Sequence, residues 1–436
     1  MTGKAKILTA TVLFAATTTL ALRAGAPLML ADGRAEGATA AAAVLALRDA
    51  NIAFYAKRAD EDPWSAADRA QLAGLWLQRG RESGDARDYV RAESAARASV
   101  MLRVAHNGRA RLAHASSLLA LHRFSEALEV AQTLVRDEPH VVGYRALLAE
   151  IQLELGRYDD AAISFDSLYH ARRNLAVAPR LARWMEIRGD ISGARRTLRN
   201  ALDNARSRHD LAAEQLAWFH LRVADHALRS GRLRDAERAL KQGLRGQPDD
   251  GRLLAARARI AALRGDWSAA LAFVAQAGDR ADLATLALAG DAHLALGDSA
   301  TAAQFFRRVE ADYAANPEPF ARQWSQFRVD HARHLPETIR LLRDEIDVRP
   351  DVLGWDLLAW ALYRNGEYAE ARSAIRQAMR MGTQDASLFF HAGMIHHALG
   401  EADTARELLQ SALRLNPRFH WFHARQAKDI LRGRRG

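Results

Sequence analysis

Apolar residues recur every three to four positions through most of the 436-residue chain, which is the pattern of amphipathic helices. The segments LLAEIQLELG and YDDAAISFDSLY, one before and one after the turn at Gly156, show this spacing clearly. A glycine between two such segments supplies a left-handed helix cap and permits a short antiparallel connection. The pattern therefore predicts an all-α protein assembled from helix hairpins.

The predicted hairpins repeat along the chain. A glycine preceded by a small residue seven positions earlier and followed by an alanine five positions later occurs seven times. These glycines are Gly156, Gly189, Gly231, Gly265, Gly297, Gly366 and Gly400, and His122 occupies the same place in an eighth unit. Most units are 32 to 34 residues apart, one interval is 42, and one of 69 spans two units. A fixed period of this length indicates an array of stacked hairpins.

The repeats resemble the tetratricopeptide repeat. Residues 352–385 match that family's pattern best, with Trp355, Leu358, Ala359, Gly366, Tyr368, Ala371 and Ala378. The resemblance covers roughly residues 105–417 and implies a right-handed α-solenoid. Counting an irregular hairpin at 66–102, we expect about ten hairpins followed by a capping helix at 418–431. One unit is degenerate, because Gln326, Arg333 and Thr338 replace its small residues and its glycine. The 42-residue interval predicts a helix within 209–230 that is two turns longer than its neighbours.

The N-terminus has the features of an export signal. Two lysines precede a charge-free stretch at 7–22, and small residues follow it. Three interpretations stay open: a cleaved signal, a retained membrane anchor, and a cytoplasmic protein with an apolar first helix. We expect a bacterial protein that is exported to the periplasm or anchored to the inner membrane. The predicted domains are a signal or anchor at 1–31, N-terminal helices at 32–104, the repeat array at 105–417, and a capping helix with a basic tail at 418–436.

The charge distribution and the absence of cysteine limit the classes of partner and ligand that the chain can bind. The formal net charge is +10, but residues 414–436 contribute +6 and residues 1–40 contribute +2, which leaves +2 for the long middle. Binding a phosphate backbone requires a basic stripe along the binding surface, so a nucleic-acid partner is a minor alternative. We interpret the basic end as an amphipathic cap with a frayed tail, and contact with a membrane surface or an acidic partner is the alternative. The absence of cysteine excludes disulfides and thiolate metal sites.

Catalytic motifs are scarce. The chain has no phosphate-binding glycine loop, no H-E-x-x-H and no G-x-S-x-G motif. His391, His396 and His397 lie close together on one predicted helix, and packing between hairpins is the simplest interpretation, with divalent-metal binding left open. We therefore predict a non-enzymatic protein without cofactor, metal or catalytic residues.

The resemblance implies that the first helix of each hairpin lines a concave groove. At the second, fifth, ninth, twelfth and thirteenth repeat positions we single out six partner-binding candidates: Arg183, Arg259, Phe327, Asp356, Trp360 and Tyr363. Arginine and aromatic residues commonly anchor protein interfaces. Packing of Phe327 and Trp360 against the next hairpin is the competing interpretation. The predicted function is a protein–protein interaction scaffold that binds a peptide or partner helix. Alternatives are an accessory subunit of an envelope enzyme or assembly complex and, less favoured, a nucleic-acid-binding helical repeat.

Overall fold

The computed structural model describes residues 33–315, 317 and 321–433. The described part contains α-helices and two short 3₁₀ helices, and no β-strand. The helices are α1 (Gly33–Glu61), α2 (Ala66–Ser83), α3 (Ala86–Leu102), α4 (Gly108–Ala120), α5 (Phe124–Asp137), α6 (Val142–Glu154), α7 (Tyr158–Leu168), α8 (Ala178–Ile187), α9 (Ile191–Arg206), α10 (Ala213–Arg229), α11 (Leu233–Gly246), α12 (Gly251–Leu263), α13 (Trp267–Ala277), α14 (Leu283–Ala295), α15 (Ser299–Ala315), α16 (Ala321–Asp330), α17 (Leu335–Val348), α18 (Val352–Arg364), α19 (Tyr368–Met379), α20 (Ala386–Ala398), α21 (Ala402–Leu415) and α22 (His423–Leu431). The 3₁₀ helices are Tyr169–Ala171 and Gly278–Arg280.

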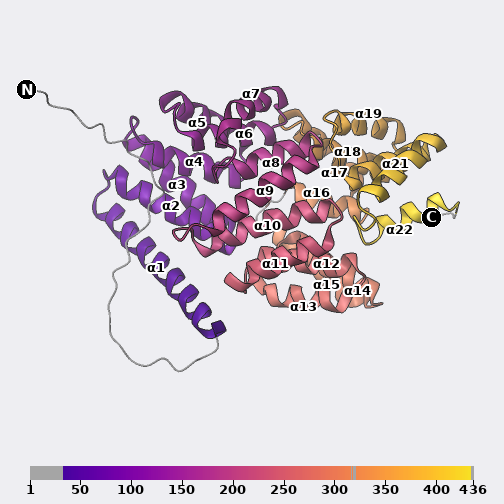
Figure 1. Ribbon diagram of the computed structural model, residues 1–436, viewed down its shortest axis with the longest axis horizontal. Coiled ribbons are helices and arrows are strands. Elements are labelled where there is room, and N and C mark those ends of the chain that lie inside the picture. Colours follow the sequence, from indigo (N-terminus) through magenta and orange to yellow (C-terminus); the bar gives the residue numbers. More distant parts are fainter. Residues whose placement is uncertain (1–32, 316, 318–320, 434–436) are drawn as a thin grey trace, which may run out of the picture.

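Ten antiparallel hairpins follow one another in the described chain, from the α2–α3 pair to the α20–α21 pair. Helix α1 packs on α2 at one end, and the short helix α22 follows the last hairpin at the other. Figure 1 shows the hairpins stacked side by side along a curved path. The prediction of an all-α solenoid of about ten hairpins with a terminal helix is confirmed.

The predicted cap conformation is present at all seven repeat glycines, whose φ angles lie between 68° and 87°. The degenerate unit is built differently. It has two left-handed residues, Ala332 with φ 51° and His334 with φ 49°. Ala332 takes the place of the cap glycine, one position before the Arg333 expected from the repeat spacing. Accordingly Ser325 is buried in this unit, whereas its neighbour Gln326 is exposed. The register of α16 is therefore shifted by one residue from the predicted one.

The 42-residue interval contains a longer helix, as predicted, but the helix is lengthened by less than the two turns expected. Helix α10 has 17 residues, whereas the corresponding helices α6, α12 and α14 have 13 each. Four additional residues make about one helical turn rather than two. Further additional length lies in the preceding α9, which has 16 residues, and in the loop between α9 and α10.

The solenoid coils tightly enough for its second turn to contact its first. Hydrogen bonds join backbone and side-chain groups that are 188 to 196 residues apart. These bonds are Arg349 Nε to the Glu154 carbonyl (2.7 Å), Val352 N to Tyr158 Oη (2.8 Å), Thr383 Oγ1 to the Ile187 carbonyl (2.6 Å) and Asn416 Nδ2 to the Leu228 carbonyl (2.9 Å). One superhelical turn thus takes just under six repeats. We call this line of contacts the seam.

Each contact of the seam pairs a glycine turn with a loop between two later hairpins. The turns at Gly156, Gly189 and Gly231 lie against Pro350, Gly382 and the Leu415–Asn416 backbone, respectively. The hydrophobic core also crosses the seam. Val352 is buried in the α6–α8 core, and Trp421 packs on the core that α10, α11 and α12 share. Because apolar burial stabilises independently of chain distance, these contacts join the two turns into one folded unit.

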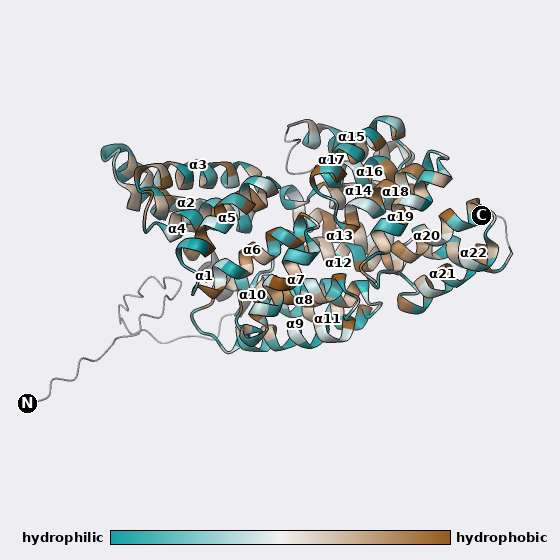
Figure 2. Cartoon of the chain, turned by 90° about the horizontal axis from the view of Figure 1, so that it is seen from above, coloured by the Kyte–Doolittle hydropathy of each residue, from teal (hydrophilic) through white to brown (hydrophobic). Residues whose placement is uncertain are grey.

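Polar and apolar surfaces are segregated on the helices. Figure 2 shows teal outer faces on helices such as α9 and α11, while brown residues gather where helices meet. Among the described helices, none combines the length and apolar character needed to cross a bilayer. The signal or anchor predicted at residues 1–31 lies outside the described residues.

Candidate functional site

Four consecutive hairpins carry a charged residue at the ninth repeat position of their first helix. In α8, α10, α12 and α14 this position carries Arg183, Asp225, Arg259 and Asp291. We call the surface formed by these helices and by α16, α18 and α20 the inner face. Because the superhelix is tight, charged side chains from several hairpins converge on this face.

A buried carboxylate organises the first-turn half of the inner face. Glu186 on α8 is 5% exposed and accepts hydrogen bonds from Arg229 (2.8 Å) and from Nδ1 of His226 (2.7 Å). The guanidinium groups of Arg183 and Arg222 lie 3.6 and 3.9 Å from the same carboxylate. Burial alone would raise the pKa of Glu186, but these cations outweigh it and hold the pKa well below its usual range. Glu186 is therefore ionised at neutral pH and ties α8 to α10.

The second-turn half of the inner face pairs carboxylates with imidazoles. Nε2 of His331 lies 3.1 Å from Asp291, and Nδ1 of His391 lies 2.8 Å from Asp356. Burial acts to lower the pKa of both histidines, but the carboxylates outweigh it and raise both pKa values. Nearby Asp330 has no cation in ion-pair contact within the described residues, and burial raises its pKa. This half is rich in carboxylates, whereas the first-turn half is rich in arginine.

A small cavity lies between the two turns at the third contact of the seam. It has a volume of about 80 Å³. Its lining residues come from α10, α12, the start of α20 and the chain after α21: Leu228, Arg229, Arg259, Leu263, Asp385, Ala386, Ser387, Asn416 and Phe419. Arg259 is solvent-exposed, yet within the described residues it has no hydrogen bond or ion pair.

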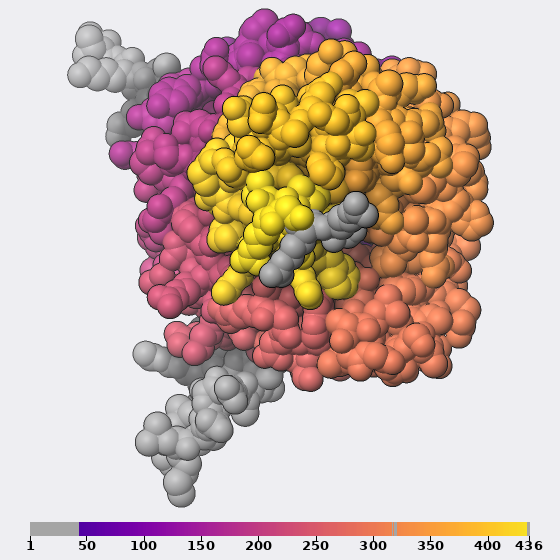
Figure 3. Space-filling view, turned by 90° about the vertical axis from the view of Figure 1, so that its right-hand side faces the viewer, coloured from indigo at the N-terminus to yellow at the C-terminus, as the bar shows by residue number. Residues whose placement is uncertain are grey.

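The end of the chain covers the second-turn half of the inner face. We call residues 417–433 the C-terminal segment. Trp421 lies against Trp267 of α13 with ring centroids 6.5 Å apart, and His423 lies against Trp360 of α18 at 5.4 Å. Figure 3 shows this segment, in yellow, crossing the middle of that end of the molecule between the orange and salmon helices. The segment therefore bridges the first and second turns.

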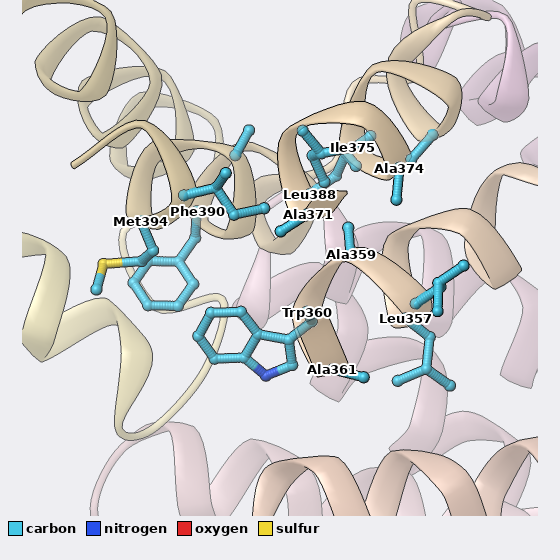
Figure 4. Packing of buried hydrophobic residues seen from close by; sticks show 14 of the residues in the cluster. Leu357, Ala359, Trp360, Ala361, Ala371, Ala374, Ile375, Leu388, Phe390 and Met394 are labelled. Atoms are coloured by element: carbon cyan, nitrogen blue, oxygen red, sulfur yellow. The ribbon is translucent and has the colours of Figure 1, made fainter. Parts of the chain in front are cut away.

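Two of the six predicted groove residues are buried. Trp360 is 2% exposed, because its ring is stacked on His391 at 4.4 Å and covered by His423. Figure 4 shows its indole directed towards Phe390 and Met394. Phe327 is 4% exposed, because the register shift of α16 turns it into the core beside Phe306. Neither side chain has surface to offer a partner in this conformation, so the competing interpretation of core packing describes both.

The other four predicted residues lie on the inner face with different partners. Arg183 is half-buried and adjoins Glu186, and Asp356 is hydrogen-bonded to His391. Tyr363 is half-buried and stacks on Trp360 with centroids 4.8 Å apart. Only Arg259 among the six combines solvent exposure with the absence of a partner in the described part of the chain. The structure thus brings Asp356, Trp360 and Tyr363 together and places Arg183 and Arg259 on the opposite half.

The histidines considered for metal binding face different partners and do not converge on one point. Nδ1 of His391 faces Asp356, whereas Nδ1 of His396 faces Glu401 across the hairpin turn. His397 is exposed. Among the described residues, no group of three or more potential ligands is positioned to hold a metal ion.

Several site residues were missed from the sequence. Glu186 occupies the twelfth repeat position, which is a groove position, but a lone glutamate beside arginines gives no distinctive signal. Asn416 stands at the very end of the repeat array, and His420 follows the array. They reach the inner face only because the chain completes a superhelical turn, and no local sequence feature indicates that contact.

The chain is similar to known helical-repeat proteins in sequence pattern and in fold. The sequence model for the tetratricopeptide repeat matches residues 112–176, 221–284 and 357–418. Similar solved structures include the APC/C hetero-tetramer Cut9–Hcn1, with 13% identity over 90% of this chain and 94% of that chain at a TM-score of 0.35. A tetratricopeptide repeat protein from Parabacteroides merdae has 16% identity over 55% and 92% at 0.38. Yeast Tom70 has 11% identity over 92% and 94% at 0.36. No curated protein matches this chain.

Proposed function

Because this chain contains tetratricopeptide repeats, we propose that it is a non-enzymatic protein-interaction scaffold whose inner face binds a peptide or a helix of a partner protein. Such repeats form extended concave surfaces suited to this task. We place the partner on the first-turn half of the inner face and on α14, because the C-terminal segment covers Trp360 of α18 on the second-turn half.

One observation carries this proposal. The inner face offers a cation, Arg259, that has no ion-pair partner among the described residues, and it also offers exposed apolar surface on α14. Arg259 is exposed, and Leu294, at the twelfth repeat position of α14, keeps 45% of its surface exposed. Exposed apolar side chains and arginine are residue types that anchor peptide interfaces. A partner segment with apolar residues and at least one acidic group fits this surface.

Site-specific photo-crosslinking tests the proposal. Benzoylphenylalanine in place of Leu294 is expected to capture a discrete partner in the native cell. The same residue in place of Ile163, which is 72% exposed on the second helix of its hairpin, is the matched control. Adducts at 294 but not at 163 support inner-face binding. Equal adducts at both positions, or adducts at 163 alone, contradict it.

We also propose that the protein acts in the cell envelope, delivered or tethered by residues 1–31. The basic start and the charge-free stretch at 7–22 support this location. Cell fractionation combined with N-terminal sequencing of the mature chain tests it. A mature N-terminus near residue 27 or 32 indicates a cleaved signal, an intact chain in the membrane fraction indicates an anchor, and an intact chain in the cytoplasmic fraction contradicts the proposal.

A further inference from the structure

The cavity between the turns has the size of a single functional group. One water molecule occupies about 10–15 Å³ by the same measure, so about 80 Å³ holds several waters or one small polar group with its stem. Its walls come from both superhelical turns: α10 and α12 on one side, and the start of α20 with residues 416 and 419 on the other. The cavity therefore exists only when the seam is closed.

The positive groups at this cavity are not fully neutralised. Arg229 donates a hydrogen bond from Nη2 to Oε2 of Glu186 at 2.8 Å. The carboxylate of Asp385 caps α20, where Oδ1 accepts hydrogen bonds from the N–H groups of Ser387 (2.8 Å) and Leu388 (3.2 Å). Arg259 lies near Asp385 and Asp225 but is within ion-pair distance of neither. Of the lining side chains, the guanidinium of Arg259 is thus a charged donor group without a protein acceptor.

Desolvation at this position is incomplete but significant. Desolvation first, and then the charge of Arg229, lower the pKa of Arg259, although Asp225 and Asp385 act in the opposite direction. The charge of Arg259 also acts on His420 of the C-terminal segment. Burial first, and then the charge of Arg259, lower the pKa of His420 to about 3. His420 is consequently neutral at physiological pH, and its Nδ1 accepts hydrogen bonds from the N–H groups of Phe422 (3.2 Å) and His423 (3.3 Å).

We propose that this cavity is a binding site for one anionic oxygen group, a carboxylate or a phosphate, held chiefly by Arg259 with Arg229 beside it. A guanidinium presents several N–H donors in a plane and pairs with such groups through two parallel hydrogen bonds. Ser387 lines the same cavity, and a serine hydroxyl can serve as a further donor. The inference deepens the proposed function and rests on it for the source of the group, which is an acidic side chain of the bound partner.

The test begins with anions alone. Isothermal titration of the full chain with inorganic phosphate and with acetate, at ionic strength matched by sodium chloride, measures the site without any partner. A capped triglutamate peptide then represents a partner's acidic side chains. Arg259→Gln is expected to weaken binding at least tenfold, and Arg259→Lys to weaken it less, because lysine keeps the charge but loses the paired geometry. Arg245→Gln, an exposed arginine on α11, is the matched control and should bind like the wild type.

The outcomes separate the sources and the two proposals. Phosphate binding without peptide binding, if sensitive to Arg259, supports the site with a free anion as its ligand, and peptide binding supports a partner side chain. Equal binding by the wild type and Arg259→Gln, or no binding of any probe, overturns the anion site even when Leu294 crosslinks a partner. Conversely, Arg259-dependent binding without crosslinks at 294 upholds the anion site and contradicts the proposed function. If Arg259→Gln loses helical circular dichroism, the comparison of Arg259→Lys with Arg245→Lys decides.

Discussion

Replacing Gly156 by alanine tests whether the seam holds the superhelix closed. Alanine at a left-handed position costs about 1–2 kcal/mol wherever it occurs. At Gly156, with φ 68°, a new Cβ atom would also lie 2.7 Å from the backbone of Pro350. Relieving that collision must displace the second turn, and overpacking of this kind costs about 1–3 kcal/mol more. We therefore expect Gly156→Ala to lower the free energy of unfolding by about 2–5 kcal/mol.

Gly265 is the matched control for this substitution. Its φ is 77°, but among the described residues nothing apart from its own chain neighbours lies within 4 Å of the Cβ position. Gly265→Ala should therefore cost only the common backbone term of about 1–2 kcal/mol. Gly189→Ala, whose Cβ would meet the Gly382 carbonyl oxygen at 2.5 Å, should behave like Gly156→Ala.

Urea denaturation followed by circular dichroism measures the energies, and small-angle X-ray scattering measures the radius of gyration. The seam variants should be destabilised more than the control and should also be larger in solution, since opening the seam separates the two turns. Equal destabilisation of Gly156→Ala and Gly265→Ala with unchanged radii would refute the reasoning, because the close contact at Pro350 would then have no energetic consequence.

Three other expectations each concern one side chain. Arg349→Met should destabilise the fold by about 2–3 kcal/mol in urea, because it removes hydrogen bonds to Glu154 across the seam. Burial lowers the pKa of His220 to about 4, whereas a histidine in the unfolded chain has a pKa of about 6.5. The stability that neutral His220 permits is therefore present above pH 6.5 and is lost as the pH falls towards 4. Through His220 alone, the free energy of unfolding should fall by about 2 kcal/mol between pH 7 and pH 5. The variant His220→Phe should lack that part of the pH dependence. Trp421→Ala should speed tryptic cleavage within 417–433, as that side chain holds the segment on the first turn.

The local architecture was predictable because the repeat is encoded locally. Each glycine turn, each small residue and each amphipathic stripe acts over fewer than forty residues, so the hairpins and their number could be inferred directly. The degenerate unit shows where this fails. With no glycine to mark the turn, Arg333 was assigned its place, whereas Ala332 adopts the left-handed conformation. A one-residue shift on a helix rotates a side chain by about 100°, which is enough to carry Phe327 into the core.

The candidate site was less predictable, because curvature decides it. The curvature of the superhelix is the sum of small rotations between neighbouring hairpins over about six repeats. The residue pattern within one repeat does not indicate the size of that sum. Trp360 occupies a groove position in its own repeat, yet His423 covers it from a segment that follows the last repeat. Arg259 is a groove candidate from its repeat position alone, but Ser387 and Asn416, which complete the cavity around it, come from a different superhelical turn.

The seam links the shape of the solenoid to its binding chemistry. The turn at Gly231 meets Asn416 at the same seam contact where Arg229, Ser387 and Asn416 wall the cavity. A looser superhelix would keep every hairpin intact, but it would separate Arg259 from the start of α20 and leave the guanidinium in open water, where a single ion pair contributes little. Closure supplies the partial desolvation that makes such an interaction worth more. Variants that open the seam should therefore lose anion binding while they retain their helical content.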